Sequence, residues 1–327
     1  MEPLYVALTL LLATGLCGCV YYGAYNPQAI TSLSECNLLV APPTLPESLV
    51  SRLSEGRIIL GYISVATVGG WEPWAVNVTR EIIVGRLGAW NETVVNPCSQ
   101  KWWKIFRGAV DWILSRGYNG VFIDNLDLVD EYPWMKACII NLVRSVKREH
   151  PHAVVMVNRG FSILPRIADS IDYLLVESYP SYYDFGAHEY RFWKGRDLEW
   201  IVSRIREAER LAETHGFRLI LLAYGDPADQ GMIEEVCRVV EEYTPGLPVY
   251  IAPWDLMKPG RCVQCGSPIE TATWTNTTTA SVGMGEKTRV TRARPTTIPV
   301  WEAVGAAVLG ATAAFILYVF ALRRGRR

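Results

Sequence analysis

The sequence has no excess of basic residues. Its 32 Lys and Arg are balanced by 33 Asp and Glu, and four of the arginines lie within the last five residues. Nucleic-acid-binding proteins more often carry a basic surface, so a nucleic-acid partner is not expected. No glycine-rich phosphate fingerprint follows any apolar run, which argues against a nucleotide-binding fold.

The spacing of a zinc site is missing as well. Cys262 and Cys265 resemble half of a zinc knuckle, but no second Cys-x-x-Cys and no spaced histidine pair follows them. They are interpreted as disulfide-forming or inert thiols and not as metal ligands. Of the eight cysteines, Cys17 and Cys19 are assigned to an N-terminal leader, and the sequence cannot choose among the possible pairings of the others.

The N-terminus is apolar. Residues 4–16 form a short apolar run followed by small residues, so residues 1–18 are predicted to be a signal peptide. Because no Lys or Arg precedes the run, a buried N-terminal strand or helix remains an alternative. The segment Leu16-Cys-Gly-Cys19 also resembles a lipidation site at Cys19.

The C-terminus has the pattern of a membrane anchor. Residues 303–322 are uncharged and long enough to cross a hydrocarbon layer of about 30 Å, and arginines follow at once. We predict a transmembrane helix at residues 300–322 and a basic cytoplasmic tail at 323–327. The Thr-rich residues 266–299 are predicted to form a disordered stalk. The expected location is the cell membrane, crossed once, with the N-terminal domain outside.

Three sequons begin at Asn77, Asn91 and Asn276. On an exported chain each is a predicted site of N-glycosylation. Such triplets also occur by chance, so they support export without proving it.

Short β-rich runs alternate with helical patterns through residues 19–265. Most of the runs are continuously apolar, as in parallel strands that are buried on both faces. Eight strands with interleaved helices favour a (β/α)8 TIM barrel, with an open doubly wound sheet as the alternative. The strands are predicted at 20–24, 38–41, 58–64, 120–124, 154–158, 173–177, 219–224 and 249–252. The helices are predicted at 30–35, 46–54, 99–117, 133–150, 161–168, 197–216 and 230–243, with Ser99 and Asp197 as N-caps.

Two carboxylates directly follow apolar strands. They are Asp124 in Gly120-Val-Phe-Ile-Asp124 and Glu177 in Tyr173-Leu-Leu-Val-Glu177. Barrel enzymes build their active sites at these strand ends, and paired carboxylates are what the cleavage of a glycosidic bond requires. The alternative is that each carboxylate caps a helix or pairs with an arginine such as Arg159.

The loops on the same face are long and aromatic. Residues 65–98 contain Trp71, Trp74 and Trp90, and residues 178–197 contain seven further aromatic residues. Flat aromatic rings suit the apolar faces of sugars. The alternative is that they pack the loops onto the rim of the barrel.

Five segments, taken together, resemble one family. They are Val20-Tyr-Tyr-Gly-Ala-Tyr25, Gly56-Arg-Ile-Ile-Leu-Gly-Tyr62, Gly117-Tyr-Asn-Gly-Val-Phe-Ile-Asp124, Val157-Asn158-Arg-Gly160 and Val176-Glu177-Ser. With them, residues 20–255 look like glycoside hydrolase family 114, the endo-α-1,4-polygalactosaminidase-like barrels and their prokaryotic relatives.

The resemblance implies a (β/α)8 barrel that hydrolyses an amino-sugar polymer with retention and uses no metal or other cofactor. It implies Asp124 as the nucleophile and Glu177 as the acid/base, with the roles open to exchange. Many relatives carry Gly-Glu sooner after the third strand than the Ala66-Thr-Val-Gly-Gly-Trp-Glu72 found here, so a loop that contacts sugar is altered. Contacts with the substrate are expected from Tyr62, Trp71, Asp127, Asn158, Tyr179, Tyr224 and Trp254.

The sequence therefore predicts a membrane-anchored extracellular glycoside hydrolase that acts on a polysaccharide or glycan, and the resemblance implies one rich in amino sugars. A non-catalytic carbohydrate-binding or surface-layer protein on the same barrel is the alternative. A structural or adhesive protein unrelated to sugars is a third interpretation.

Overall fold

A nearly closed sheet of parallel strands forms the centre of the molecule. The computed structural model describes residues 17–23, 33, 36–87 and 92–266. Within them the sheet runs in the order β1-β2-β3-β7-β8-β9-β12-β13-β14, parallel throughout except that β14 is antiparallel to β13. The strands are β1 (Gly18–Val20), β2 (Leu38–Ala41), β3 (Ile58–Ser64), β7 (Gly120–Asp124), β8 (Val154–Asn158), β9 (Tyr173–Glu177), β12 (Arg218–Tyr224), β13 (Val249–Ala252) and β14 (Arg261–Val263).

The strands form because their residues are apolar on both faces. All residues of β2, β7, β9 and β13 are buried, since one face lines the inside of the sheet and the other lies under helices. Six of the eight predicted strands have the predicted bounds, and β12 begins one residue earlier. The strand predicted at 20–24 instead spans Gly18–Val20, because Gly18 pairs with Leu38 of β2.

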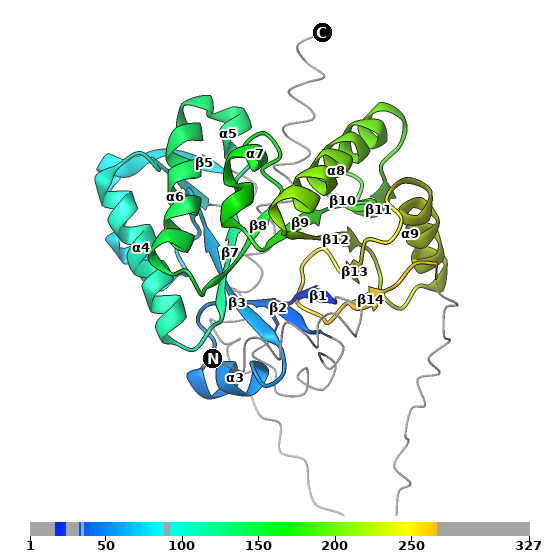
Figure 1. Ribbon diagram of the computed structural model, residues 1–327, viewed down its shortest axis with the longest axis horizontal. Helices are drawn as coiled ribbons and strands as arrows, with labels where there is room; N and C mark the ends of the chain where they lie inside the picture. Colours follow the sequence, from blue (N-terminus) through cyan, green and yellow to red (C-terminus); the bar gives the residue numbers. More distant parts are fainter. Residues whose placement is uncertain (1–16, 24–32, 34–35, 88–91, 267–327) are drawn as a thin grey trace, which may run out of the picture.

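Helices cover the outside of the sheet (Figure 1). The longer ones are α3 (Glu47–Leu53), α4 (Gln100–Ser115), α6 (Lys136–Glu149), α8 (Gly195–His215) and α9 (Gln230–Tyr243), and the short ones are α5 (Leu128–Glu131), α7 (Leu164–Ile167), η1 (Pro73–Asn77), η2 (Arg80–Ile82), η3 (Pro133–Met135) and η4 (Ala168–Ser170). The Ser99 hydroxyl caps α4 by accepting from Lys101 N at 3.1 Å, as predicted. Asp197 does not cap α8, because this helix begins earlier, at Gly195, and places Asp197 in its first turn.

Two small antiparallel sheets were not predicted. One joins β4 (Thr67–Val68), β5 (Ile83–Leu87) and β6 (Glu92–Val95), and the other is the hairpin of β10 (Ser181–Asp184) and β11 (Glu189–Phe192). They follow β3 and β9, so both lie in the connections that leave the C-terminal end of the barrel. The long loops of the sequence are therefore largely ordered sheet.

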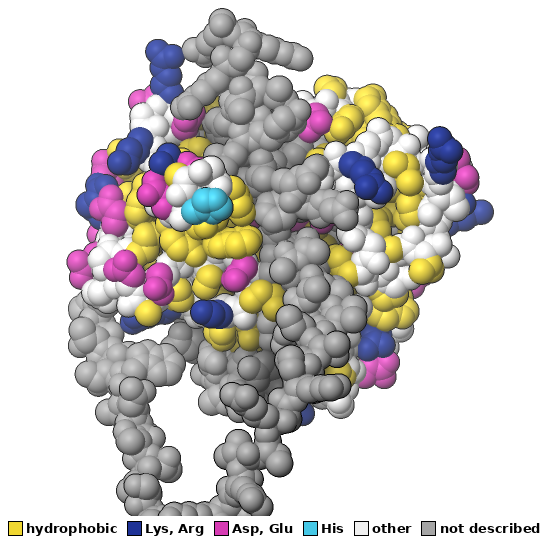
Figure 2. All heavy atoms as spheres, turned by 180° about the vertical axis from the view of Figure 1, so that it is seen from behind, with side chains coloured by type: hydrophobic (Ala, Val, Ile, Leu, Met, Phe, Trp, Pro, Cys, Tyr) yellow, Lys and Arg dark blue, Asp and Glu magenta, His cyan; other side chains and the backbone are white. Residues whose placement is uncertain are grey.

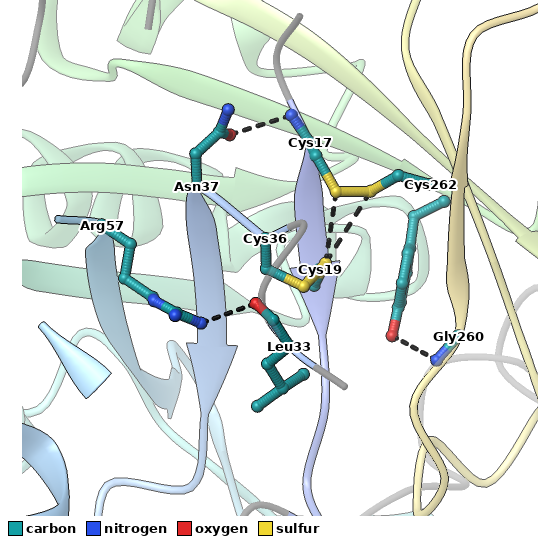
Figure 3. The surroundings of a disulfide bond; sticks show 9 residues. Cys17, Cys19, Leu33, Cys36, Asn37, Arg57, Gly260 and Cys262 are labelled. Carbon is teal, nitrogen blue, oxygen red and sulfur yellow. Dashed lines mark hydrogen bonds between the residues drawn. A yellow bond between two sulfur atoms is a disulfide. The ribbon is translucent and has the colours of Figure 1, made fainter. Parts of the chain in front are cut away.

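All eight cysteines form disulfides, and this corrects the assignment of two of them to the leader. The pairs are Cys17–Cys262, Cys19–Cys36, Cys98–Cys138 and Cys237–Cys265. Figure 3 shows the first two beside each other at β1, where Asn37 Oδ1 also accepts from Cys17 N at 2.9 Å. Cys17 and Gly18 thus belong to the folded domain, and the predicted leader boundary at residue 18 disagrees with the structure. A disulfide-bonded Cys19 is also not available for lipidation.

The Cys17–Cys262 bond lies where the sheet closes on itself. β1 and β13 are neighbours, but no ladder joins them within the described part of the chain. The disulfide links Cys17, the residue before β1, to Cys262 of β14, the strand paired with β13, across 245 residues of sequence. It restricts the unfolded chain and gives a covalent connection where backbone pairing is missing.

Several predictions fall on residues that the structure does not describe. These are the transmembrane helix at 300–322, the cytoplasmic tail, nearly all of the stalk, the helix at 30–35, Asn91 and Asn276. Among the described residues, no helix has the length and apolar character needed to cross a bilayer. Figure 2 shows acidic and basic side chains interspersed with hydrophobic ones on one face of the molecule.

Candidate active site

Three neighbouring strands bring the candidate catalytic side chains together. Asp124 ends β7, Asn158 ends β8 and Glu177 ends β9, and these strands are adjacent in the sheet. Because parallel strands end at the same edge, the three side chains meet at the C-terminal end of the barrel. All three are buried, with exposed fractions of 2%, 3% and 4% in that order.

Asn158 connects the two carboxyl groups. Its Nδ2 donates to Asp124 Oδ1 at 3.0 Å and also to Glu177 Oε2. Since both bonds leave one nitrogen, the two acceptor oxygens are no more than about 6 Å apart. The structure therefore places the two predicted acids in one site, with a shared amide between them.

Tyrosines hold the remaining oxygens of the pair. Tyr62 of β3 donates its hydroxyl to Asp124 Oδ2 at 3.1 Å, and Tyr224 at the end of β12 donates to Glu177 Oε1. Burial, together with the nearby carboxylates, raises the pKa of both tyrosines well above the usual value, so they remain donors. Tyr62, Asn158 and Tyr224 therefore lie directly against the two candidate catalytic acids.

The carboxyl group of Glu177 is poised to carry a proton. Burial raises its pKa to about 7, and the negative charge of Asp124 acts in the same direction. The hydrogen bonds from Tyr224 and Asn158 oppose this shift, because they stabilise the ionised form. Glu177 is thus suited to act as an acid near neutral pH.

The backbone turns sharply after each of the three residues. Asn125, Arg159 and Ser178 follow Asp124, Asn158 and Glu177, and their φ angles are 64°, 50° and 61°. Non-glycine residues rarely adopt this left-handed conformation, which costs about 1 kcal/mol or more at each position and is found most often at functional sites.

Asp127 has a supporting role. Its Oδ1 accepts from Gly160 N at 3.0 Å, and its Oδ2 lies 3.3 Å from Arg159 Nε. Arg159 therefore forms an ion pair with Asp127, and its positive charge also lowers the pKa of Glu177. Burial raises the pKa of Asp127 and Arg159 opposes this. These contacts of Asp127 fix the loop after β8, and its contact with the substrate stays a prediction.

A third buried carboxyl group, Glu92, was missed by the sequence analysis. It begins β6, is 2% exposed, and has its pKa raised to about 8, first by burial and then by Glu72 and Asp124. Thr67 hydrogen-bonds to Glu92 and also to Ser64 Oγ, at 2.7 Å. The only signal in the sequence near Glu92 was the sequon that begins at Asn91, which directs attention to the asparagine.

Glu92 is connected to the catalytic pair by a chain of hydrogen bonds. Asn125 Nδ2 donates to Thr67 Oγ1 at 3.2 Å and to Ser64 Oγ at 3.1 Å, and Asn125 N donates to Asp124 Oδ1 at 2.7 Å. Tyr22, just after β1, interacts electrostatically with the same groups. Burial raises its pKa well above the usual value, and the charges of Asp124, Glu177 and Glu92 raise it further.

The aromatic residues divide between the site and its surroundings. Trp71 packs against Tyr62 with ring centroids 6.0 Å apart. Trp254 stacks on Tyr183 of the β10–β11 hairpin at 5.2 Å, so it belongs to an aromatic cluster beside the site. Tyr179 is fully buried and its hydroxyl lies 3.3 Å from Thr244 Oγ1, which places it against the end of α9; its contact with the substrate stays a prediction.

Polar atoms without partners remain around the pair. Among the described residues, Asn158 Oδ1, Trp71 Nε1, Glu92 Oε2 and Ser178 Oγ are buried and make no hydrogen bond. Buried polar groups are normally satisfied, so these atoms are free to bind the hydroxyl or amino groups of a ligand.

The described residues offer no acidic or histidine cluster for a metal. Among them, the one group with suitable ligand spacing is Cys17, Cys19 and Cys262, and these sulfurs are in disulfides. A neutral carboxylic acid beside a second carboxyl group is the arrangement used for the hydrolysis of glycosidic bonds.

Two solved structures are similar to this chain in fold. The glycoside hydrolase domain of PelA from Pseudomonas aeruginosa is similar to this chain, with a TM-score of 0.62 and 19% identity over 74% of this chain and 96% of that domain. The Ega3 structure of Aspergillus fumigatus, a complex with galactosamine, has a TM-score of 0.57 and 15% identity over 77% of this chain and 96% of Ega3. A search of curated proteins by sequence finds no match.

The family assignment comes from the sequence itself. Residues 19–198, more than half of the chain, match the model of glycoside-hydrolase family GH114. This segment includes β2 to β9 and both candidate catalytic acids. The chain therefore belongs to glycoside-hydrolase family GH114 and is a glycoside hydrolase.

Proposed function

We propose that the chain is a membrane-anchored extracellular enzyme that cleaves an amino-sugar-rich polysaccharide with retention of configuration. The observation that carries the proposal is the bridge from Asn158 to both Asp124 and Glu177. Retaining glycosidases hold their carboxyl groups about 5–5.5 Å apart, whereas inverting ones separate them by about 6.5–9.5 Å. A shared donor nitrogen favours the shorter spacing.

The two acids have different roles. Glu177, with its pKa raised to about 7, donates its proton to the glycosidic oxygen while Asp124 attacks the anomeric carbon and the carbon–oxygen bond breaks. Glu177, now ionised, then accepts a proton from a water molecule, whose oxygen attacks the same carbon and releases Asp124 as a carboxylate. The hydrogen bond from Tyr62 stabilises the charge that returns to Asp124.

The charges around the site favour a cationic sugar. Asp127 interacts electrostatically with Asp124, whereas Glu92, whose pKa is raised to about 8, keeps its proton near neutral pH; the negative charge at the site therefore comes from Asp124 and Asp127. The amino group of an unacetylated amino sugar is positive near neutral pH, so it is attracted to such a site. The bound galactosamine of the Ega3 structure supports the same class of substrate.

The location rests on the sequence. An apolar C-terminal segment followed by arginines supports an anchor with the catalytic domain outside. The four disulfides support export, since such bonds persist in oxidising compartments. Because Cys17 is disulfide-bonded, cleavage of a leader must precede it.

Hydrolysis of galactosamine oligomers by the full chain tests the proposal. Asp124→Asn and Glu177→Gln are expected to reduce kcat by 10²-fold or more, whereas Asp172→Asn, which lies before β9 and pairs with Lys147, is the matched control. NMR of the first product is expected to show the configuration of the substrate. Inversion, or full activity in either catalytic variant, would refute the mechanism.

The assigned roles can be separated with an activated substrate. A dinitrophenyl glycoside has a leaving group that needs no proton, so Glu177→Ala should still form the covalent intermediate with it. Asp124→Ala should form none. The opposite result would exchange the roles of the two acids.

A further inference from the structure

A surface groove lies between η1 and α4, and none of its lining residues belongs to the candidate active site. It has a volume of about 480 Å³, with walls formed by Trp74 and Trp112. The two indole rings meet edge to face at 6.1 Å, and the guanidinium of Arg116 covers Trp112 at 4.7 Å. The volume is in the range of small-ligand sites, about 300–1,000 Å³, and aromatic walls suit the apolar faces of sugars.

The helix at the bottom of the groove has an unexplained glycine. Gly108 is in the middle of α4, and a Cβ added there would meet nothing within 4 Å. Glycine destabilises a helix interior by about 0.5–1 kcal/mol relative to alanine, and no packing within the described residues requires it here. A glycine that costs stability and leaves open space fits a site where another molecule approaches the helix backbone.

The rim of the groove carries a glycosylation acceptor. Asn77 lines the groove, ends η1 and is exposed, and it begins the sequon Asn77-Val-Thr79. Its side-chain amide makes no hydrogen bond to the described residues, whereas the Thr79 hydroxyl accepts from Lys101 Nζ at 2.7 Å. The neighbouring Val76 is 85% exposed, the highest value among the large hydrophobic residues of the described chain.

We propose that an N-linked glycan on Asn77 folds back into this groove and packs on Trp112 over Gly108. Because the glycan is attached at the rim of the groove, its local concentration there is high. The groove can therefore hold it even without measurable affinity for a free sugar. It covers the exposed part of Trp112 and thereby stabilises the connection between η1 and α4. The proposal does not depend on the hydrolase reaction.

The proposal is tested with the full chain produced in a host that attaches N-glycans. Two quantities are measured: the rate at which the glycan is cleaved and the thermal stability of the chain. An endoglycosidase should cut the Asn77 glycan of the folded chain several-fold more slowly than the Asn276 glycan, and Trp112→Ala should remove this protection. Gly108→Leu is the second variant, because it fills the groove without deleting a wall. Asn77→Gln should lower Tm by about 2–4 °C in the wild-type background and by nothing in the Gly108→Leu background.

Three results would overturn the proposal. The first is an intact mass showing that Asn77 is unmodified while Asn276 carries a glycan. The second is an equal fall in Tm when Asn77→Gln is made with and without Gly108→Leu. The third is a rate of cleavage of the Asn77 glycan that is the same in Trp112→Ala as in the wild type, which would show that the glycan does not pack on Trp112.

Discussion

Replacing Glu92 with glutamine should stabilise the protein, and the gain should grow with pH. Glu92 is 2% exposed, and its pKa is raised from 4.5 to about 8, mainly by burial. Between these values the folded state keeps a proton that the unfolded state releases, so stability falls as pH rises. The slope is about 1.4 kcal/mol per pH unit, which amounts to about 5 kcal/mol over the whole window.

The sign follows from proton counts. Below pH 4.5 the Glu92 carboxyl group is neutral in both the folded and the unfolded state, so it makes no pH-dependent contribution to the free energy of unfolding. Above about pH 8 it is charged in both states, and the folded state bears the full cost of burying that charge. Glutamine has nearly the same shape and no charge at any pH. The difference in unfolding free energy between Glu92→Gln and the wild type should therefore be small at pH 5 and large at pH 8.

Urea denaturation at pH 5, 6, 7 and 8 with the disulfides intact measures this difference. Taking the difference between variant and wild type cancels the titration of all other groups that the substitution leaves unchanged. Glu55→Gln, at an exposed position, is the matched control and should show no such trend. An equal effect of Glu92→Gln at pH 5 and pH 8 would show that Glu92 is ionised throughout, and the reasoning from burial would be wrong.

Three further predictions concern the acid, the sheet and the closure of the barrel. Tyr224→Phe removes a hydrogen bond that lowers the pKa of Glu177, so the fall of kcat/KM at alkaline pH should move to higher pH; an unchanged profile would contradict the contact. Gly120→Ala places a Cβ 1.8 Å from Val154 O between β7 and β8, so soluble yield or Tm should fall strongly, whereas wild-type stability would contradict the close approach. Cys17→Ser should lower stability by about 2–5 kcal/mol in denaturant titrations, and a neutral effect would mean that closure does not depend on the disulfide.

The barrel strands were predictable because each is a nearly unbroken apolar run between helices. In β7 and β9 all five residues are buried, so the sequence signal is continuous and its bounds are sharp. The β10–β11 hairpin gives no such signal, because most of its residues are only partly buried and aromatic and charged types mix along it. Its order comes from stacking, as between Tyr183 and Trp254, which are far apart in the sequence.

Part of the candidate site could be predicted from the sequence for the same reason, and part could not. Asp124 and Glu177 stand out because a carboxylate directly after a buried strand must be paired or functional. Glu92 follows no apolar run, and only its contact with Thr67 across the small sheet places it near Asp124. Disulfide pairing could not be predicted either, since the first cysteine bonds one that lies 245 residues away.

The three left-handed residues explain why the reactive groups lie at the strand ends. Asn125, Arg159 and Ser178 each turn the chain away immediately after a catalytic or bridging side chain. That turn lets the strand run unbroken up to the side chain, whose position is then fixed by the ladder, while the departing chain leaves room beside it.

Each turn is held by contacts with neighbouring segments: Asn125 by Ser64 and Thr67, Arg159 by Asp127, and the Ser178 carbonyl by Trp193 Nε1. A strained conformation persists only where its surroundings determine it, and here three adjacent strands carry the same strain at the same level of the barrel. The strain therefore belongs to the geometry that brings Asp124 and Glu177 within reach of one Asn158 amide, which a flexible loop would not maintain.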